Sequence, residues 1–256
     1  MAVSEVHGLN RFAEYMDGLE DCYTVIGGTA CDILLNDADL DFRATKDIDV
    51  ILIIENRLPE VVSAVWRLVR DGGYNCGWKS SESVHFYRFT NPSVVGFPIV
   101  LELFSRAPSF IKEPDGLTIV PLPAGDEVSS LSAILLDDDY YTYMKSGRKM
   151  INGVTVLDEV HLVPFKAKAY LDLSKRRADG ERVDSSDIKK HKKDVFRLLQ
   201  LFTPQTSSTL PESIRADMTE FCGKVHIEGV PLKQMGIPLT LEEGIEMLKR
   251  VYGLQE

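Results

Sequence analysis

The N-terminal part of the chain alternates between two spacings of apolar residues, one helical and one strand-like. Apolar side chains between Leu9 and Leu19 recur at every third or fourth position, which predicts an amphipathic helix. Residues Tyr23 to Ile26 form a short β-favouring run that two glycines stop, and Thr29 can then cap a helix through Leu35. The pattern predicts a strand, a tight turn and a helix in succession.

Four further segments extend this pattern. The run Asp47 to Ile54 is rich in β-branched residues and carries two carboxylates near its start, which predicts a largely buried central strand. Pro59 opens a helix through about Arg70, where two glycines follow. Two β-rich runs, Val84 to Phe89 and Pro98 to Phe104, are joined by a turn signal, so we expect them to pair antiparallel.

From about Ser129 onward most segments have helical spacing. Val163 to Arg177 and Ser186 to Phe202 are the clearest helices, and Thr240 with Glu243 forms a capping-box start for the last one. The fold class that follows is α/β, with a mixed sheet flanked by helices and then a mostly helical C-terminal domain. The predicted domains are residues 1–125 and residues 126–256.

Composition narrows the class of protein. The chain has 256 residues, 44% of them hydrophobic, and a formal net charge of −10, which argues against a surface that binds nucleic acid everywhere. The four cysteines have neither zinc-site spacing nor the density of a disulfide scaffold, which suits a reducing compartment. No apolar run is long enough to suggest a membrane span, and the N-terminal residues lack a signal-peptide pattern. We therefore expect a cytoplasmic protein.

The residue types that carry chemistry gather in two of the predicted strands. Strand periodicity places Asp47 and Asp49 on one face, where two like charges are costly unless water or a cation neutralises them. Hard cations such as Mg²⁺ bind carboxylate oxygens and so neutralise their negative charge. Glu102 is an isolated charge within another strand and could complete the site, although an ion pair with Arg106 or Arg88 is the alternative.

The glycine turn offers a place for phosphate. Gly27 and Gly28 leave the backbone open to close approach, the amides of the following helix point at the ligand, and the Thr29 hydroxyl adds a donor. An ordinary strand-to-helix turn is the alternative interpretation. With a triphosphate held there, the carboxylates predict nucleotidyl transfer with pyrophosphate as the leaving group.

In its order of motifs the chain resembles the polymerase-beta-type nucleotidyltransferases. The motifs are Ile26-Gly27-Gly28-Thr29, then Asp47-Ile48-Asp49 at the head of an apolar strand, then Glu102 in a later strand. The resemblance implies that Gly27, Gly28 and Thr29 bind phosphate. It also implies that Asp47, Asp49 and Glu102 are catalytic and hold two Mg²⁺ ions, with a nucleoside triphosphate as substrate.

Within that superfamily the chain looks like the AbiEii group of abortive-infection toxins. Arg43 precedes Thr45-Lys46-Asp47-Ile48-Asp49, and the C-terminal half is helical. The resemblance implies nucleotide binding by Lys46 and by Lys166 or Lys168, and it points to Asp194 for an acidic helical motif. The chain departs from the pattern at position 197, which is Arg where a second aspartate is expected. An antitoxin protein is the partner that this resemblance implies.

Charge distribution bears on the acceptor of the transferred group. Residues 161–200 hold eleven Lys and Arg against six Asp and Glu, a local balance of +5. The runs Lys175 to Arg177 and Lys189 to Lys193 could attract RNA or the triphosphate, or form a solvated helix face. We weigh three functions. The first is transfer to RNA or protein, with the toxin of a toxin-antitoxin pair as one form of it. The second is transfer to a small molecule such as an aminoglycoside, and the third is silent binding of a nucleotide or partner.

Overall fold

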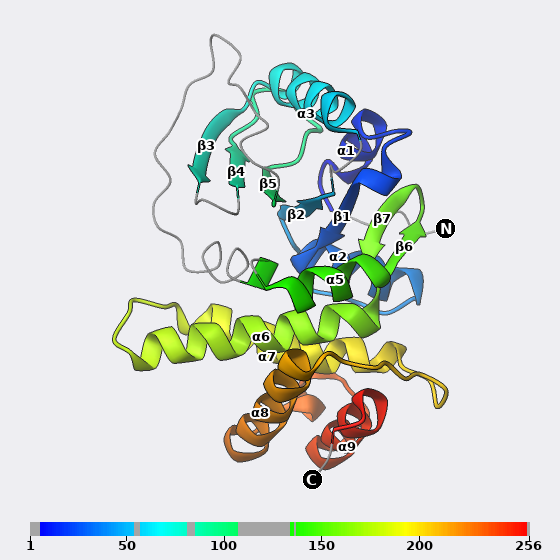
Figure 1. The fold of residues 1–256 in the computed structure, drawn as a ribbon, viewed down its shortest axis with the longest axis vertical. Coiled ribbons are helices and arrows are strands. Elements are labelled where there is room, and N and C mark those ends of the chain that lie inside the picture. Colours follow the sequence, from blue (N-terminus) through cyan, green and yellow to red (C-terminus); the bar gives the residue numbers. More distant parts are fainter. Residues whose placement is uncertain (1–5, 54–56, 81–84, 107–133, 136, 255–256) are drawn as a thin grey trace. The chain divides into compact units, whose positions relative to one another are not determined.

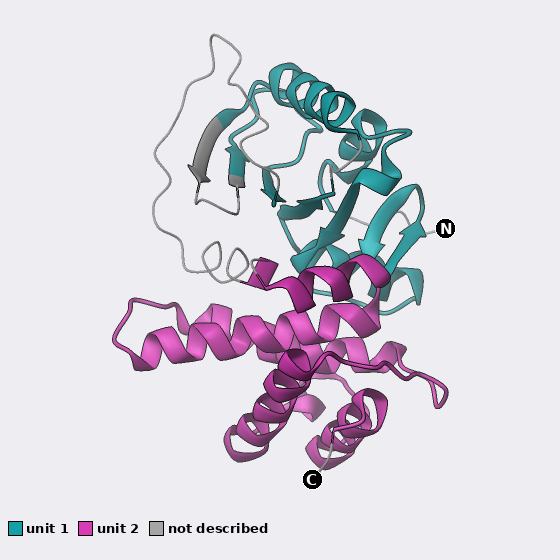
Figure 2. Cartoon of the chain, viewed as in Figure 1, with its two compact units in different colours: residues 1–125, 148–157 teal, residues 126–147, 158–256 magenta. Residues whose placement is uncertain are grey.

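The computed structural model describes residues 6–53, 57–80, 85–106, 134–135 and 137–254. The chain divides into two compact units (Figure 2). Unit 1 contains residues 1–125 and 148–157, and unit 2 contains residues 126–147 and 158–256. This division differs from a single boundary near residue 125, because residues 148–157 return to unit 1 after the chain has entered unit 2.

Unit 1 is built on one mixed seven-stranded sheet in the order β3-β4-β5-β2-β1-β7-β6 (Figure 1). The strands are β1 (Tyr23–Ile26), β2 (Asp47–Leu52), β3 (Asn75–Ser80), β4 (His85–Thr90), β5 (Val100–Ser105), β6 (Arg148–Ile151) and β7 (Val154–Leu157). Strand β2 pairs parallel with β5 and antiparallel with β1, which makes it central. The predicted fold class, a mixed sheet with flanking helices and a mostly helical C-terminal part, is confirmed.

In the described part of unit 1 the sheet is accompanied by the α-helices α1 (Leu9–Tyr15), α2 (Gly27–Asp37) and α3 (Leu58–Gly72). The Trp66 ring of α3 meets the Phe89 ring of β4 edge-on, with 6.0 Å between the ring centroids. Phe89 is in register with Leu101 of β5, and Leu101 is in register with Ile48 of β2. Helix α3 therefore packs on the sheet face that carries these apolar side chains. Asp47 and Asp49, the sequence neighbours of Ile48, point to the opposite face.

Most of the elements predicted for unit 1 are present. Strand β1 has the predicted bounds, and β4 and β5 pair antiparallel. Helix α3 has Pro59 in its first turn and ends at Gly72, with Gly73 as its C-cap. The expectation that Thr29 caps the second helix is wrong. Helix α2 begins at Gly27 with Ile26 as its N-cap, so Thr29 lies inside the first turn. The N-cap lies three residues earlier than predicted, because the φ of 68° at Gly27 lets the chain turn directly out of β1.

Two parts of the sheet fall outside the predicted elements. Strand β3 pairs antiparallel with β4. The hairpin β6–β7 lies in a region predicted to be helical, and β7 pairs parallel with β1. Its turn residues Asn152 and Gly153 have φ values of 49° and 80°, the left-handed conformations that a two-residue hairpin turn requires. The expected onset of helical structure near Ser129 lies outside the described residues.

Unit 2 is helical over most of its described length. Its long helices are α5 (Asp138–Ser146), α6 (Glu159–Ala178), α7 (Ser185–Leu198), α8 (Glu212–Glu228) and α9 (Leu241–Tyr252). Helix α6 packs against α5, α7 and α8. Edge-on ring pairs join these helices: Tyr140 with Phe165 at 5.2 Å and Tyr170 with Phe221 at 5.5 Å between centroids. The predicted helices in residues 163–177 and 186–202 are confirmed, and residues 199–201 continue the second as a 3₁₀ turn.

The helix ends of unit 2 follow from local sequence. Thr240 and Glu243 form the predicted capping box of α9, in which the Glu243 amide donates to the Thr240 hydroxyl at 3.2 Å. Asp137 caps α5 by accepting from the Asp139 and Tyr140 amides. Pro164 lies inside α6 and cannot donate to the Val160 carbonyl, and the buried Tyr252 hydroxyl donates to that oxygen instead at 2.7 Å. This bond ties α9 to α6.

Candidate functional site

Three predicted carboxylates lie on one face of the sheet in unit 1. Along β2, Ile48 is buried while Asp47 and Asp49 are partly exposed, which confirms the expected alternation. Asp49 is in parallel register with Glu102 of β5, so these residues are direct neighbours on that face. Adjacent strands lie about 4.8 Å apart. Local periodicity predicts no strand register, and it is the pairing that brings the isolated acid of β5 beside the acid pair of β2.

The start of α2 lies against the same carboxylates. A Cβ added to Gly27 would collide with the Asp49 carboxylate, so the backbone at the helix start and this side chain are in close approach. A Cβ on Gly28 would lie 2.9 Å from the Thr45 hydroxyl oxygen. Among the described residues no side chain caps the N-terminus of α2. Its first amides carry the positive end of the helix dipole and can bind an anion. They lie beside the acid row, the name used here for Asp47, Asp49 and Glu102.

Thr29 has a use other than capping. Its side chain is fully buried, and its hydroxyl donates to the Asp47 carbonyl oxygen at 2.6 Å. A hydroxyl has a single hydrogen to donate, so in this state that hydrogen serves the backbone of β2. The bond fixes the start of β2 against the first turn of α2, which positions Asp47. The role of Thr29 as a phosphate donor stays a prediction.

Glu102 is almost fully buried and has a cationic neighbour. The Arg88 Nε atom of β4 lies 3.2 Å from Glu102 Oε1, and the two residues are in antiparallel register. This ion pair is one of the alternatives that the sequence leaves open for Glu102. Within the described residues no group of three or more His, Cys, Asp or Glu side chains has the spacing of a metal site. The acid row thus shares a face of the sheet without forming a three-ligand cluster.

Two basic residues precede the acid pair. Lys46 is exposed. The Arg43 guanidinium lies 4.9 Å from the centroid of the Phe42 ring, and one of its nitrogens would be 3.4 Å from a Cβ on Gly28. Arg43 therefore lies near the glycine turn and brings positive charge to the N-terminus of α2. The nucleotide-binding role of Lys46 stays a prediction.

Lys166 and Asp194 form a buried ion pair inside unit 2. Their Nζ and Oδ2 atoms are 3.2 Å apart, and their side chains are 3% and 0% exposed. Arg197 reaches the other oxygen of Asp194 at 3.2 Å. Position 197, where the chain departs from the AbiEii pattern, therefore provides a second cation for Asp194. A buried charge of this kind holds two helices together, and the nucleotide-binding role of Lys166 stays a prediction.

Lys168 belongs to a second polar cluster in unit 2. Its Nζ atom lies 3.0 Å from Asp217 and 3.7 Å from Asp172, and the Tyr140 hydroxyl donates to Asp217 at 3.0 Å. Burial by itself lowers the pKa of Lys168, but the hydrogen bond to Asp217 and the nearby carboxylates outweigh burial and raise it. Asp172 follows Lys168 at helical spacing, whereas nothing in the sequence indicates Asp217. The nucleotide-binding role of Lys168 also stays a prediction.

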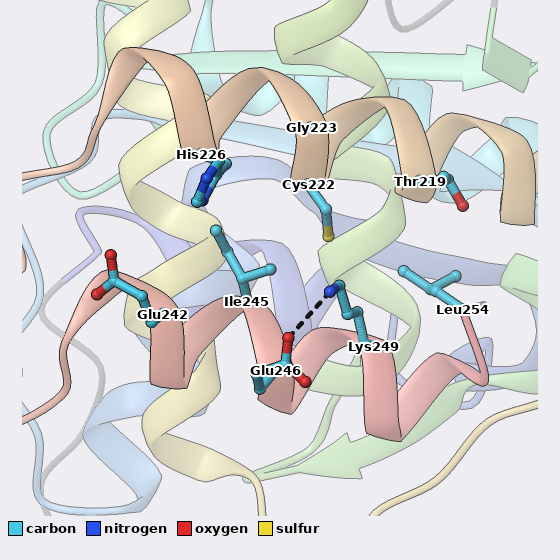
Figure 3. A pocket seen from close by; sticks show the side chains of 9 residues that line it. All are labelled: Thr219, Cys222, Gly223, His226, Glu242, Ile245, Glu246, Lys249 and Leu254. Atoms are coloured by element: carbon cyan, nitrogen blue, oxygen red, sulfur yellow. Dashed lines mark hydrogen bonds and ion pairs between the residues drawn. The ribbon is translucent and has the colours of Figure 1, made fainter. Parts of the chain in front are cut away.

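A pocket of about 480 Å³ lies between α8 and α9 (Figure 3). Cys222 points into it, and burial raises the pKa of this thiol to about 11, so the thiolate nucleophile is scarce at neutral pH. Lys249 binds Glu246 at 2.9 Å across one turn of α9. None of the residues predicted to carry chemistry lines this pocket.

No protein-family model and no curated protein matches this chain. Among solved structures, the chain is similar to an antigenic nucleotidyltransferase-like protein from Paracoccidioides brasiliensis. The identity is 16%, the TM-score is 0.44, and the match covers 95% of this chain and 94% of that one. A likeness of this size carries no argument about activity. No helix among the described residues combines the length and apolarity that crossing a bilayer requires.

Proposed function

We propose that unit 1 is a metal-dependent nucleotidyltransferase that moves a nucleoside monophosphate from a nucleoside triphosphate to a hydroxyl acceptor. The observation that carries this proposal is the approach of Gly27 to the Asp49 carboxylate, beside Glu102 in register on β5. A helix N-terminus binds phosphate, and adjacent carboxylates bind the cation that phosphate brings with it. A site for phosphate and a site for its cation, the two requirements of triphosphate binding, thus lie next to each other in unit 1.

The acid pair suits Mg²⁺ as a donor set. Asp47 and Asp49 are hard oxygen ligands, partly exposed and on the same face. Mg²⁺ is commonly held by one or two carboxylates and completes its shell with water and substrate phosphates, so a three-carboxylate cluster is not required. When bound, the ion neutralises phosphate charge and favours in-line displacement. Asp47 and Asp49 are the residues that would hold it, and Glu102 is the further candidate ligand.

The residues of the chain then have distinct tasks. The amides of Gly27 and Gly28 bind the triphosphate, with Arg43 and Lys46 adding positive charge near it. The acceptor hydroxyl attacks the α-phosphorus, the bond to pyrophosphate breaks, and Glu102 is the candidate base for the hydroxyl proton. Thr29 is a positioning residue, because its bond to the Asp47 carbonyl fixes the acid pair relative to α2. RNA and protein are the acceptors that we propose, with toxin activity and an antitoxin partner as part of the AbiEii-like hypothesis.

The ion pair between Arg88 and Glu102 favours a second function, which is nucleotide binding without transfer. Because Arg88 engages the proposed base, the chain could bind a nucleotide without transferring it. Label transfer separates the two functions. Each nucleoside triphosphate labelled at the α-phosphate is incubated with the protein, magnesium and one of three acceptors: total RNA, a protein extract or an aminoglycoside.

If the chain is a transferase, we expect label on one acceptor class. The label should be absent when a chelator removes magnesium, and absent in the variant Asp47→Asn/Asp49→Asn. The matched control is Asp17→Asn/Asp37→Asn, which removes two exposed carboxylates of unit 1 that lie elsewhere. Nucleotide binding without transfer to any acceptor would establish the silent binder instead. Growth arrest on expression in a bacterial host, absent from Asp47→Asn/Asp49→Asn, would support the toxin role.

A further inference from the structure

The two basic runs of the sequence line one pocket in unit 2. Helices α6 and α7 pack together, which brings the C-terminal turn of α6 beside the first turns of α7. Between them lies a pocket of about 480 Å³, within the range of about 300–1,000 Å³ typical of ligand sites. The polar groups of its lining come from Ser174, Arg177, Ser185, Lys189, Lys192 and Glu228.

The charge of this α6–α7 pocket is predominantly positive. Three cationic side chains line it against one carboxylate, and that carboxylate, Glu228, binds Lys192 at 2.8 Å. Arg177 and Lys189 are exposed and form no ion pair in the part of the chain that the structure describes. The Arg177 charge also acts on the exposed Asp184 carboxylate without forming an ion pair, so both cations can still bind an anion. Lys192 is only 12% exposed and its Nζ atom lies 5.6 Å from the centroid of the Tyr170 ring, so it is a fixed charge.

Hydroxyl groups supply donors of the right kind for an oxyanion. Ser174 and Ser185 line the pocket from α6 and α7. Fixed cations together with hydroxyl donors are typical of a phosphate site.

The neighbouring α8–α9 pocket shows that this arrangement is not general in unit 2. That pocket has the same size, but Lys249 is its single Lys or Arg, Glu246 binds that lysine, and Glu242 adds negative charge (Figure 3). An anion is repelled there and attracted in the α6–α7 pocket. The difference lies in Arg177 and Lys189, the residues that the sequence marks as parts of basic runs.

We propose that the α6–α7 pocket is a phosphate-binding site, held by Arg177, Lys189 and Lys192, for a phosphate carried by a polynucleotide backbone or free in solution. It needs neither the acid row of unit 1 nor a metal. Binding is therefore measured without magnesium and without nucleoside triphosphate, so its outcome is independent of the transferase hypothesis.

The test titrates the full chain with a labelled 12-nucleotide single-stranded RNA, followed by fluorescence anisotropy, and with inorganic phosphate, followed by calorimetry. Three proteins are compared: wild type, Arg177→Gln/Lys189→Gln, and the control Arg70→Gln/Lys233→Gln, which removes the same charge from exposed positions that do not line the pocket. We expect the first variant to weaken binding about 10-fold more than the control does. For RNA, the slope of log K against log salt should fall by about 0.7 for each lost phosphate contact.

The two arms identify the source of the phosphate. If millimolar inorganic phosphate does not displace the bound RNA, the pocket binds the phosphates of a polynucleotide backbone. If inorganic phosphate displaces the RNA, the pocket binds free phosphate. The proposal is overturned if neither probe binds wild type, or if both double variants bind alike. Thermal unfolding checks that the exposed substitutions leave the fold intact.

Discussion

Asp49 on β2 and Asp194 on α7 are both carboxylates that the sequence analysis singles out, but their surroundings differ. Asp194 is fully buried and receives Lys166 and Arg197 on its two oxygens. Asp49 is partly exposed beside the uncapped start of α2 and the acid row. We expect a buried acid with its cations inside one helical unit to stabilise the fold, and we propose that the partly exposed acid pair beside a helix N-terminus binds a ligand. The comparison separates residues whose loss should cost stability from residues whose loss should cost binding.

The largest effect should come from breaking the buried pair. Asp194→Ala removes the carboxylate that binds Lys166, whose side chain is 3% exposed. We expect the free energy of unfolding to fall by about 3–5 kcal/mol. Urea denaturation followed by circular dichroism measures this change, and a loss below about 1 kcal/mol would mean that the pair does not hold α6 and α7 together.

Replacing both partners sharpens the same point. Lys166→Met/Asp194→Leu removes the two buried charges at similar volume and leaves Arg197, whose side chain is 21% exposed. We expect this double variant to regain most of the stability that Asp194→Ala loses. If Lys166 is structural, this folded double variant binds nucleoside triphosphate as wild type does. Lost binding in a folded protein would instead support the nucleotide-binding role predicted for Lys166.

A smaller effect should come from the close approach at Gly27. Gly27→Ala combines a φ of 68° with a collision against the Asp49 carboxylate, whereas Gly153→Ala has a φ of 80° and open space around its Cβ. Left-handed strain alone costs about 1–2 kcal/mol, and overpacking adds about 1–3 kcal/mol. We therefore expect Gly27→Ala to lower the free energy of unfolding by more than Gly153→Ala does. Equal losses would show that Asp49 moves aside freely.

The smallest stability change belongs to the acid pair itself. Asp47→Asn/Asp49→Asn keeps side-chain shape and removes two partly exposed charges, so the free energy of unfolding should change by less than about 1 kcal/mol. The same urea denaturation checks it. A loss as large as that of Asp194→Ala would erase the contrast between the two regions.

Sequence periodicity predicted the acid face of β2 because alternation along a strand is local. It could not predict that β5 would place Glu102 beside Asp49, since strand register depends on distant pairing. Thr29 has the chemistry of a cap, but the positive φ of Gly27 moves the helix start ahead of it. The sequence carried a signal for the turn of β6–β7, because Asn152-Gly153 between apolar residues is a strong hairpin signal, and its place in a helical region hid it.

The pairing of Lys166 with Asp194 depends on how α6 packs against α7, which no local pattern reports. The same packing gathers Arg177 and Lys189 into one pocket, so two basic runs that the sequence could assign either to anion binding or to a solvated face gain a specific location. Strand β3 has little β-favouring pattern and exists through its pairing with β4. Local periodicity thus found single elements, and tertiary pairing decided which charges meet.

The central claim is that Asp47 and Asp49 hold the metal of a bound nucleoside triphosphate. Calorimetric titration of each nucleoside triphosphate, with and without magnesium, tests it on wild type, Asp47→Asn/Asp49→Asn and the control Asp17→Asn/Asp37→Asn. The account predicts magnesium-dependent binding to wild type and control, weakened at least about 100-fold in Asp47→Asn/Asp49→Asn. Equal binding by all three proteins, or no binding to wild type under any condition, would contradict it.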